Sequence, residues 1–99
     1  MPIYSNLGRL LMEIIRMNKK EFLIDDIVEV YPANKSTLKV MVYNLKMYGF
    51  ISAKIFHHPN MKQARPNNLY FFTKGNIARI KAVFNTALVE EGIILPEGD

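Results

Sequence analysis

The segment from Asn34 to Ile51 constrains the fold more than any other part of this sequence. Asn34 or Ser36 can begin a helix, because a short polar side chain accepts hydrogen bonds from free backbone N–H groups. Gly49 stands where a residue in the left-handed conformation ends a helix. The segment therefore predicts a helix over about 35–48, whose apolar face is made by Leu38, Met41, Val42 and Leu45.

Apolar spacing predicts two further helices ahead of this one. From Leu7 to Ile15, apolar residues recur at offsets 0, 3, 4, 7 and 8, which is one face of a helix. A short extended piece at 22–24 follows. A second helix should then begin at Asp25 or Asp26, where a carboxylate suits the positive end of the helix dipole. This helix is expected to be short, because Pro32 disfavours helical backbone at the residue before it.

The second half of the chain predicts a hairpin and a last helix. Aromatic and β-branched residues favour strands at 52–56 and 69–73. Between them, residues 57–68 contain two prolines and three asparagines, a composition typical of a loop. Thr73 can cap a helix from Lys74 to about Leu88, and Gly92 ends any continuation. The apolar segment at 93–96 is expected either to pack back on the domain or to be partly mobile.

The length of 99 residues and the 49% hydrophobic content fit one domain, with a core over about 7–88 and a tail over 89–99. No apolar run approaches the roughly 20 residues that a membrane helix needs. The absence of cysteine excludes disulfides and thiolate metal sites. The first residues show no basic segment ahead of an apolar one, so a cytoplasmic protein is expected.

Charge is unevenly distributed along the chain. No acidic residue occurs from Val30 to Val89, a stretch of sixty residues. A basic surface of this kind attracts a polyanion, and nucleic acid is the obvious candidate, although a solvated basic surface without a ligand is the alternative. The bases of this stretch are Lys35, Lys39, Lys46, Lys54, Lys62, Arg65, Lys74, Arg79 and Lys81.

The predicted order of two helices, a longer helix ended by glycine, a hairpin and a final helix resembles the winged helix-turn-helix family of DNA-binding domains. The segment from Asn34 to Leu38, continued by 44–51, is similar to the family's recognition helix and its exit into the wing. The segment 72–75, with the sequence FTKG, resembles the step from the second wing strand into the last helix, with glycine one residue sooner. The resemblance implies an α+β, mostly helical fold with three helices, a β-hairpin wing and a C-terminal helix.

The resemblance further implies sequence-specific binding of double-stranded DNA by a small transcriptional regulator. A recognition helix at about 35–48 would enter the major groove, and a wing at about 52–73 would meet the flanking backbone or minor groove. On this helix, Asn44 suits adenine, Lys39 suits guanine and Val40 suits a thymine methyl group. The expected DNA-binding residues are Lys35, Ser36, Thr37, Lys39, Val40, Tyr43, Asn44, Lys54, His57, His58, Lys62, Gln63 and Arg65.

Other chemistry receives little support. His57 and His58 lack a third metal ligand, and neighbouring residues of a strand point to opposite faces. Asp25 and Asp26 could be a catalytic pair of carboxylates, but neighbours on a helix do not face each other. A helix start explains both residues. The sequence contains no glycine-rich phosphate loop and no nucleophile motif. We therefore expect no enzyme activity, no metal and no cofactor.

The sequence leaves two alternatives open, one about the number of chains and one about the binding partner. The last helix carries an apolar stripe that predicts a homodimer, unless the first and last helices of a monomer cover one core. The stripe consists of Ile77, Ile80, Phe84 and Leu88. Winged helices also serve as docking domains, so a module that binds an acidic protein partner is the alternative function.

Overall fold

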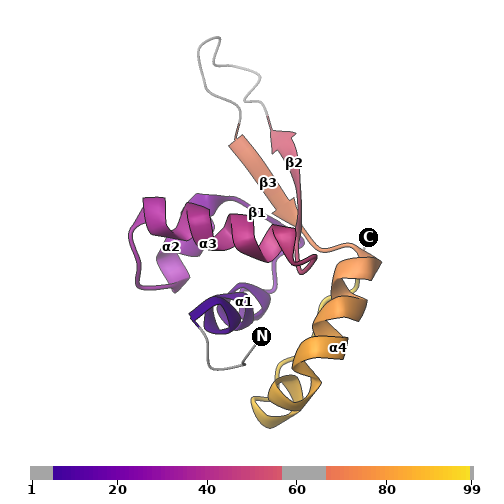
Figure 1. The fold of residues 1–99 in the computed structure, drawn as a ribbon. Coiled ribbons are helices and arrows are strands. Elements are labelled where there is room, and N and C mark those ends of the chain that lie inside the picture. Colours follow the sequence, from indigo (N-terminus) through magenta and orange to yellow (C-terminus); the bar gives the residue numbers. More distant parts are fainter. Residues whose placement is uncertain (1–5, 57–66, 99) are drawn as a thin grey trace.

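Figure 1 shows a mostly helical molecule with one small sheet; the computed structural model describes residues 6–56 and 67–98. The α+β class predicted from the sequence is confirmed. The helices are α1 (Asn6–Arg16), α2 (Ile24–Val30), α3 (Lys35–Met47) and α4 (Lys74–Glu90). The strands are β1 (Glu21–Phe22), β2 (Ser52–Phe56) and β3 (Asn67–Phe71).

The helix α1 provides one wall of the core. Its residues Leu10, Leu11 and Ile14 are almost completely buried, as the apolar spacing predicted. The helix is followed by Asn18 with a φ of 55°, a left-handed conformation that asparagine tolerates better than most residues. Near this end, the Arg16 guanidinium pairs with Glu13 at 2.7 Å and with Glu91 at 3.8 Å, which links α1 to the residue after α4.

The helix α2 ends before a proline, as expected, but it starts at Ile24 and not at Asp25 or Asp26. Both acids lie in its first turn, and the extended piece predicted at 22–24 ends with β1 at Phe22. The start was predicted late because Asp26 reaches back to the backbone of the residue before the helix. The side chain of Asp26 accepts hydrogen bonds from the Leu23 backbone N–H and from Lys19 Nζ, each at 2.9 Å. The Leu23 N–H, and then Lys19, hold the pKa of Asp26 below its ordinary value of 3.8. At the other end, Tyr31 has extended backbone, which Pro32 imposes on the residue before it.

The three strands form an antiparallel sheet in the order β1-β3-β2. Phe22 pairs with Tyr70 on one side of β3, and Ile55 pairs with Asn68 on the other. The prediction of a loop up to Asn68 was wrong at this end, because β3 begins at Asn67. Both asparagines pair with β2, and loop-like composition does not reveal such a partner.

The helix α4 is capped and bent. The Thr73 hydroxyl accepts from the Asn76 N–H at 3.1 Å, and the Asn76 carboxamide oxygen accepts from the Thr73 N–H at 2.9 Å. The backbone of Phe84 leaves helical geometry (φ −116°, ψ 15°) and bends the helix. After Gly92, the tail returns along α4, as Figure 1 shows in yellow. Gly98 then lies so close to the start of α4 that a Cβ there would clash with the backbone nitrogen of Lys74.

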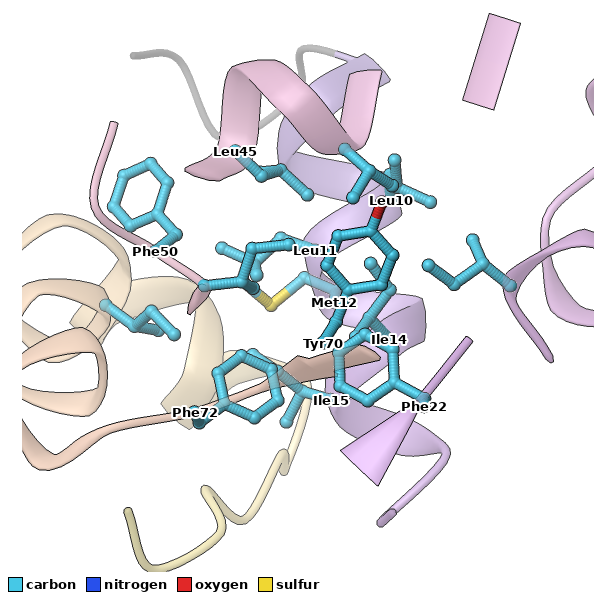
Figure 2. Close-up of a cluster of buried hydrophobic side chains, with 14 of the residues drawn as sticks. Leu10, Leu11, Met12, Ile14, Ile15, Phe22, Leu45, Phe50, Tyr70 and Phe72 are labelled. Carbon is cyan, nitrogen blue, oxygen red and sulfur yellow. The ribbon is translucent and has the colours of Figure 1, made fainter. Parts of the chain in front are cut away.

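Figure 2 shows the core, where aliphatic side chains of α1 meet aromatic side chains of the sheet. The ring of Phe22 lies 5.9 Å from that of Tyr70 and 5.7 Å from that of Phe72. Phe50, just after α3, makes an edge contact with Phe84 of α4 at 5.3 Å. The core therefore connects the exit of α3 to the last helix and fixes the position of α3.

Candidate nucleic-acid interface

The helix α3 has one face in the core and one in solvent. Leu38, Val42 and Leu45 are completely buried. On the opposite side, Val40 is 61% exposed, Tyr43 57% and Met47 67%. All the predicted DNA-binding residues of this helix are exposed. They are Lys35, Ser36, Thr37, Lys39, Val40, Tyr43 and Asn44.

Local chemistry fixes both ends of α3. The Asn34 side chain accepts from the Thr37 N–H at 2.8 Å, so Asn34 is the cap and Ser36 is not. The Ser36 hydroxyl donates to the same Asn34 oxygen at 2.9 Å, and this bond occupies its proton. Gly49 has a φ of 84°, as the C-terminal glycine pattern predicted. A Cβ at Gly49 would stand 3.1 Å from Arg79 Cδ, so α4 also restricts this position to a small residue.

A buried amide joins the exit of α3 to the start of α4. Asn76 Nδ2 donates to the Gly49 carbonyl at 2.7 Å, and its Oδ1 accepts from the Ser52 hydroxyl at 2.8 Å as well as from Thr73 N–H. Asn76 is only 7% exposed. The Arg79 guanidinium donates to the Tyr48 carbonyl beside it. These bonds hold the hairpin and α4 at a set angle to α3.

Two of the predicted DNA-binding lysines are engaged within the chain. Lys35 Nζ lies 2.8 Å from Asp25 Oδ1, and Lys54 Nζ lies 2.9 Å from Glu21 Oε2. Lys54 also stands over the Phe71 ring, 5.4 Å from its centroid. Both acids neutralise charge next to the exposed face. The exposed ion pairs are weak in water, so each lysine can exchange partners at small cost.

A hollow of about 270 Å³ lies between α3, the start of α2 and β3. Two lysines of α3 line it, Lys39 and Lys46, and neither has an ion pair in the described part of the chain. The sequence prediction had missed Lys46 and the two asparagines of β3. The signal for Lys46 was its spacing of seven residues from Lys39, which places both on one side of a helix. The polar lining is completed by Asp25, Tyr43, Asn67 and Asn68.

The remaining wing residues predicted to bind DNA are His57, His58, Lys62, Gln63 and Arg65, and they lie outside the described residues. The described strands that lead to this segment are β2 and β3, whose register is continuous from Ser52 opposite Phe71 to Phe56 opposite Asn67. The hairpin therefore stands beside the end of α3, as Figure 1 shows.

The stripe predicted to join two chains is used inside one chain. Ile80 is completely buried, and Ile77, Phe84 and Leu88 are 8%, 2% and 5% exposed. The stripe faces the core because α1, Phe50 and the returning tail cover it. It is therefore not a free surface, and the count of apolar residues in α4 had overstated what α4 leaves uncovered. The exposed apolar residues near this end are Val83, Val89 and Ile94.

Within residues 6–56 and 67–98, no three acidic or histidine side chains are grouped so that they could hold a metal ion. None of the helices described there is both long and apolar enough to span a membrane.

Two short helices, a capped third helix and an adjoining antiparallel hairpin have now been placed. The chain has the winged helix-turn-helix fold. Neither a family model nor a curated protein matches the sequence. Among solved structures, a possible transcriptional regulator for arsenical resistance is similar, with a TM-score of 0.57 over 90% of this chain and 82% of that one. At 15% identity, this likeness concerns the fold alone.

Proposed function

We propose that this chain is a small cytoplasmic transcriptional regulator that binds double-stranded DNA sequence-specifically. In this proposal α3 lies in the major groove, and the β2–β3 hairpin meets the flanking backbone or minor groove. The observation that carries it is the outward face of α3, where Val40, Tyr43 and Asn44 are exposed on a helix held rigidly from behind by the core. The fold shared with a possible regulator supports the same proposal.

The side chains on this face suit base edges. A major groove about 12 Å wide accepts one helix, and a carboxamide such as that of Asn44 can pair with both hydrogen-bonding groups of adenine. Val40 can contact a thymine methyl group. Such a contact makes binding more favourable because it removes an exposed apolar group from water. The excess of bases from Val30 to Val89 adds a sequence-independent attraction to phosphates.

The test is a fluorescence anisotropy titration with a random-sequence duplex at several salt concentrations, followed by selection of the preferred site. We expect micromolar binding that weakens steeply with salt. Asn44→Ala should then lower the preference for the selected site about tenfold. Asn85→Ala is the matched control, because Asn85 is an exposed asparagine on α4. Absence of binding at low salt would refute the proposal.

We further propose that the regulator is a homodimer, as a two-fold protein reads a palindromic site. Ile77 and its neighbours are buried in the core and cannot form a dimer contact. The support for a dimer therefore comes from exposed apolar side chains on α4 and the tail, at Val83, Val89 and Ile94. Sedimentation equilibrium at high concentration should give twice the chain mass, and Val89→Lys should shift it toward one. The mass of a single chain throughout would refute dimerisation.

A docking module for an acidic protein is the second candidate, and the same face of α3 favours it. Val40, Tyr43 and Met47 form an exposed apolar row on α3, beside the lysines that line the hollow. Apolar contacts rimmed by charge are typical of protein interfaces. Salt-sensitive binding to an acidic protein, together with no binding to any duplex, would establish this function in place of DNA binding.

A further inference from the structure

The lysines of α3 do not lie on its outward face. The helix turns about 100° per residue, so Lys39 and Lys46 fall on the side between the buried row at Leu38 and the outward row at Val40. Both lysines line the hollow toward β3. They are seven residues apart, which is about 10 Å along the helix axis. Side chains of this length can both reach one group placed between them.

The hollow carries a net positive charge. Lys39 and Lys46 have no ion pair in the described ranges, in contrast to Lys35 and Lys54. Among the residues that the structure describes, the one acid that lines it is Asp25, whose carboxylate lies 2.8 Å from Lys35 Nζ. The opposite wall is formed by β3 at Asn67 and Asn68. Because neighbouring residues of a strand point to opposite faces, one of these two carboxamides can donate a hydrogen bond into the hollow. Cations and amide donors around one hollow are the groups that bind an oxyanion.

We infer that this hollow seats a phosphate of the DNA backbone, so that Lys39 and Lys46 set the register of α3 while Val40, Tyr43 and Asn44 read the bases. This inference rests on the proposed function. It moves Lys39 from the guanine contact that its residue type suggested to a phosphate contact. A DNA strand that passes between α3 and the hairpin would place a phosphate at the hollow.

The first arm of the test measures salt dependence. Lys39→Gln, Lys46→Gln and the double variant are titrated with the selected duplex and with a scrambled one at several salt concentrations. Phosphate contacts predict that both duplexes lose affinity equally and that the slope of log K against log salt falls by about one for each lysine removed. The matched control is Lys81→Gln, an exposed lysine on α4 whose loss should leave the slope unchanged.

The outcome that would overturn the inference is specific. If Lys39→Gln abolishes the preference for the selected duplex and leaves the salt slope unchanged, Lys39 reads a base. If the double variant behaves as the wild type on both duplexes, the hollow takes no phosphate. Circular dichroism melting of each variant checks folding, and exposed lysines predict no change in melting temperature.

The second arm uses inorganic phosphate and nuclear magnetic resonance, and it separates this inference from the proposed function. Backbone amide resonances of Asn67, Asn68 and Lys46 should shift on titration, and the shifts should vanish in the double variant. Phosphate shifts without any duplex binding would refute DNA binding while assigning the hollow to a free oxyanion ligand. If the duplex binds, but there are neither phosphate shifts nor a change of salt slope in the double variant, the phosphate site in the hollow is refuted. The proposed DNA binding is then unaffected.

Discussion

The helices α1 and α3 use similar apolar content in opposite ways. Apolar residues of α1 point inward, and Leu11 and Ile14 are at most 1% exposed. The helix α3 buries Leu38, Val42 and Leu45 but keeps Val40, Tyr43 and Met47 in water. An apolar side chain left in water forgoes the free energy that burial would supply. The helix α3 is thus a scaffold element on one side, and on the other it presents the apolar surface to which the proposed function assigns binding.

The contrast extends to charge. On α1, Arg16 pairs with acids of its own chain, at Glu13 and Glu91. On α3, Lys39 and Lys46 have no such pair within the described residues and share a hollow. Arg16 of α1 thus joins elements of the fold, whereas Lys39 and Lys46 of α3 pair with no acid of the described residues, unlike Lys35 of the same helix. The two helices should respond differently to mutation.

The largest effect is expected for Leu11→Ala in α1. It should lower the free energy of unfolding by about 2–5 kcal/mol, because a completely buried side chain leaves a cavity. Val40→Ala on the exposed face of α3 should change it by less than about 0.5 kcal/mol. Urea denaturation followed by circular dichroism measures both. Equal losses in the two variants would break the distinction between scaffold and surface.

Asn76→Ala should have the next largest effect, because it removes the joint between α3 and α4. The Gly49 carbonyl and the Thr73 N–H would lose their partners in a part-buried place, at a cost of about 1–3 kcal/mol. Asn85→Ala, on the exposed side of the same helix, should stay within about 0.5 kcal/mol of the wild type. Chemical denaturation distinguishes them, and a neutral Asn76→Ala would mean that the joint is not structural.

The ends of α3 and the start of α4 were predictable because their signals are local. Asn34, Gly49 and Thr73 each act within a few residues, through a cap or a left-handed turn. The extent of β3 was not predictable in this way, because Asn67 joins the sheet through a partner strand that is distant in sequence. The bend at Phe84 was also missed, since nothing in its neighbours breaks a helix.

The exposure of the residues on α3 was predictable from the sequence, but their partners in the fold were not. The exposed face of α3 follows from helical spacing alone. The engagement of Lys35 by Asp25 and of Lys54 by Glu21 depends on how separate elements are packed. The burial of the α4 stripe has the same origin, because the returning tail and Phe50 decide which face stays open. Helical spacing determines which residue types share a face, and tertiary packing determines whether that face is buried, paired or exposed.

Tyr43→Ala should reveal the function of the α3 surface with little effect on folding. We expect affinity for the selected duplex to fall about tenfold, which corresponds to about 1.4 kcal/mol, because an exposed ring would lose its contact with DNA. Stability should change by less than about 0.5 kcal/mol. Tyr43→Phe separates the hydroxyl from the ring. Anisotropy titration measures both variants, and full affinity in Tyr43→Ala would remove the ring from the interface.

The smallest effect is expected from acid, through Asp26 at the start of α2, the helix that leads into α3. The Leu23 N–H lowers the pKa of Asp26, so its charged form stabilises the folded chain at pH values above 3.8, and this contribution is lost as the pH falls through the lowered pKa. Asp26→Asn should cost about 1 kcal/mol at neutral pH and flatten that acid-side decline. Asp25→Asn is the control, because among the described residues Asp25 pairs only with Lys35, at the surface. Thermal melts between pH 2 and 7 compare the variants. If Asp26→Asn retains the wild-type decline in stability, other carboxylates cause it, and the start of α2 does not depend on this charge.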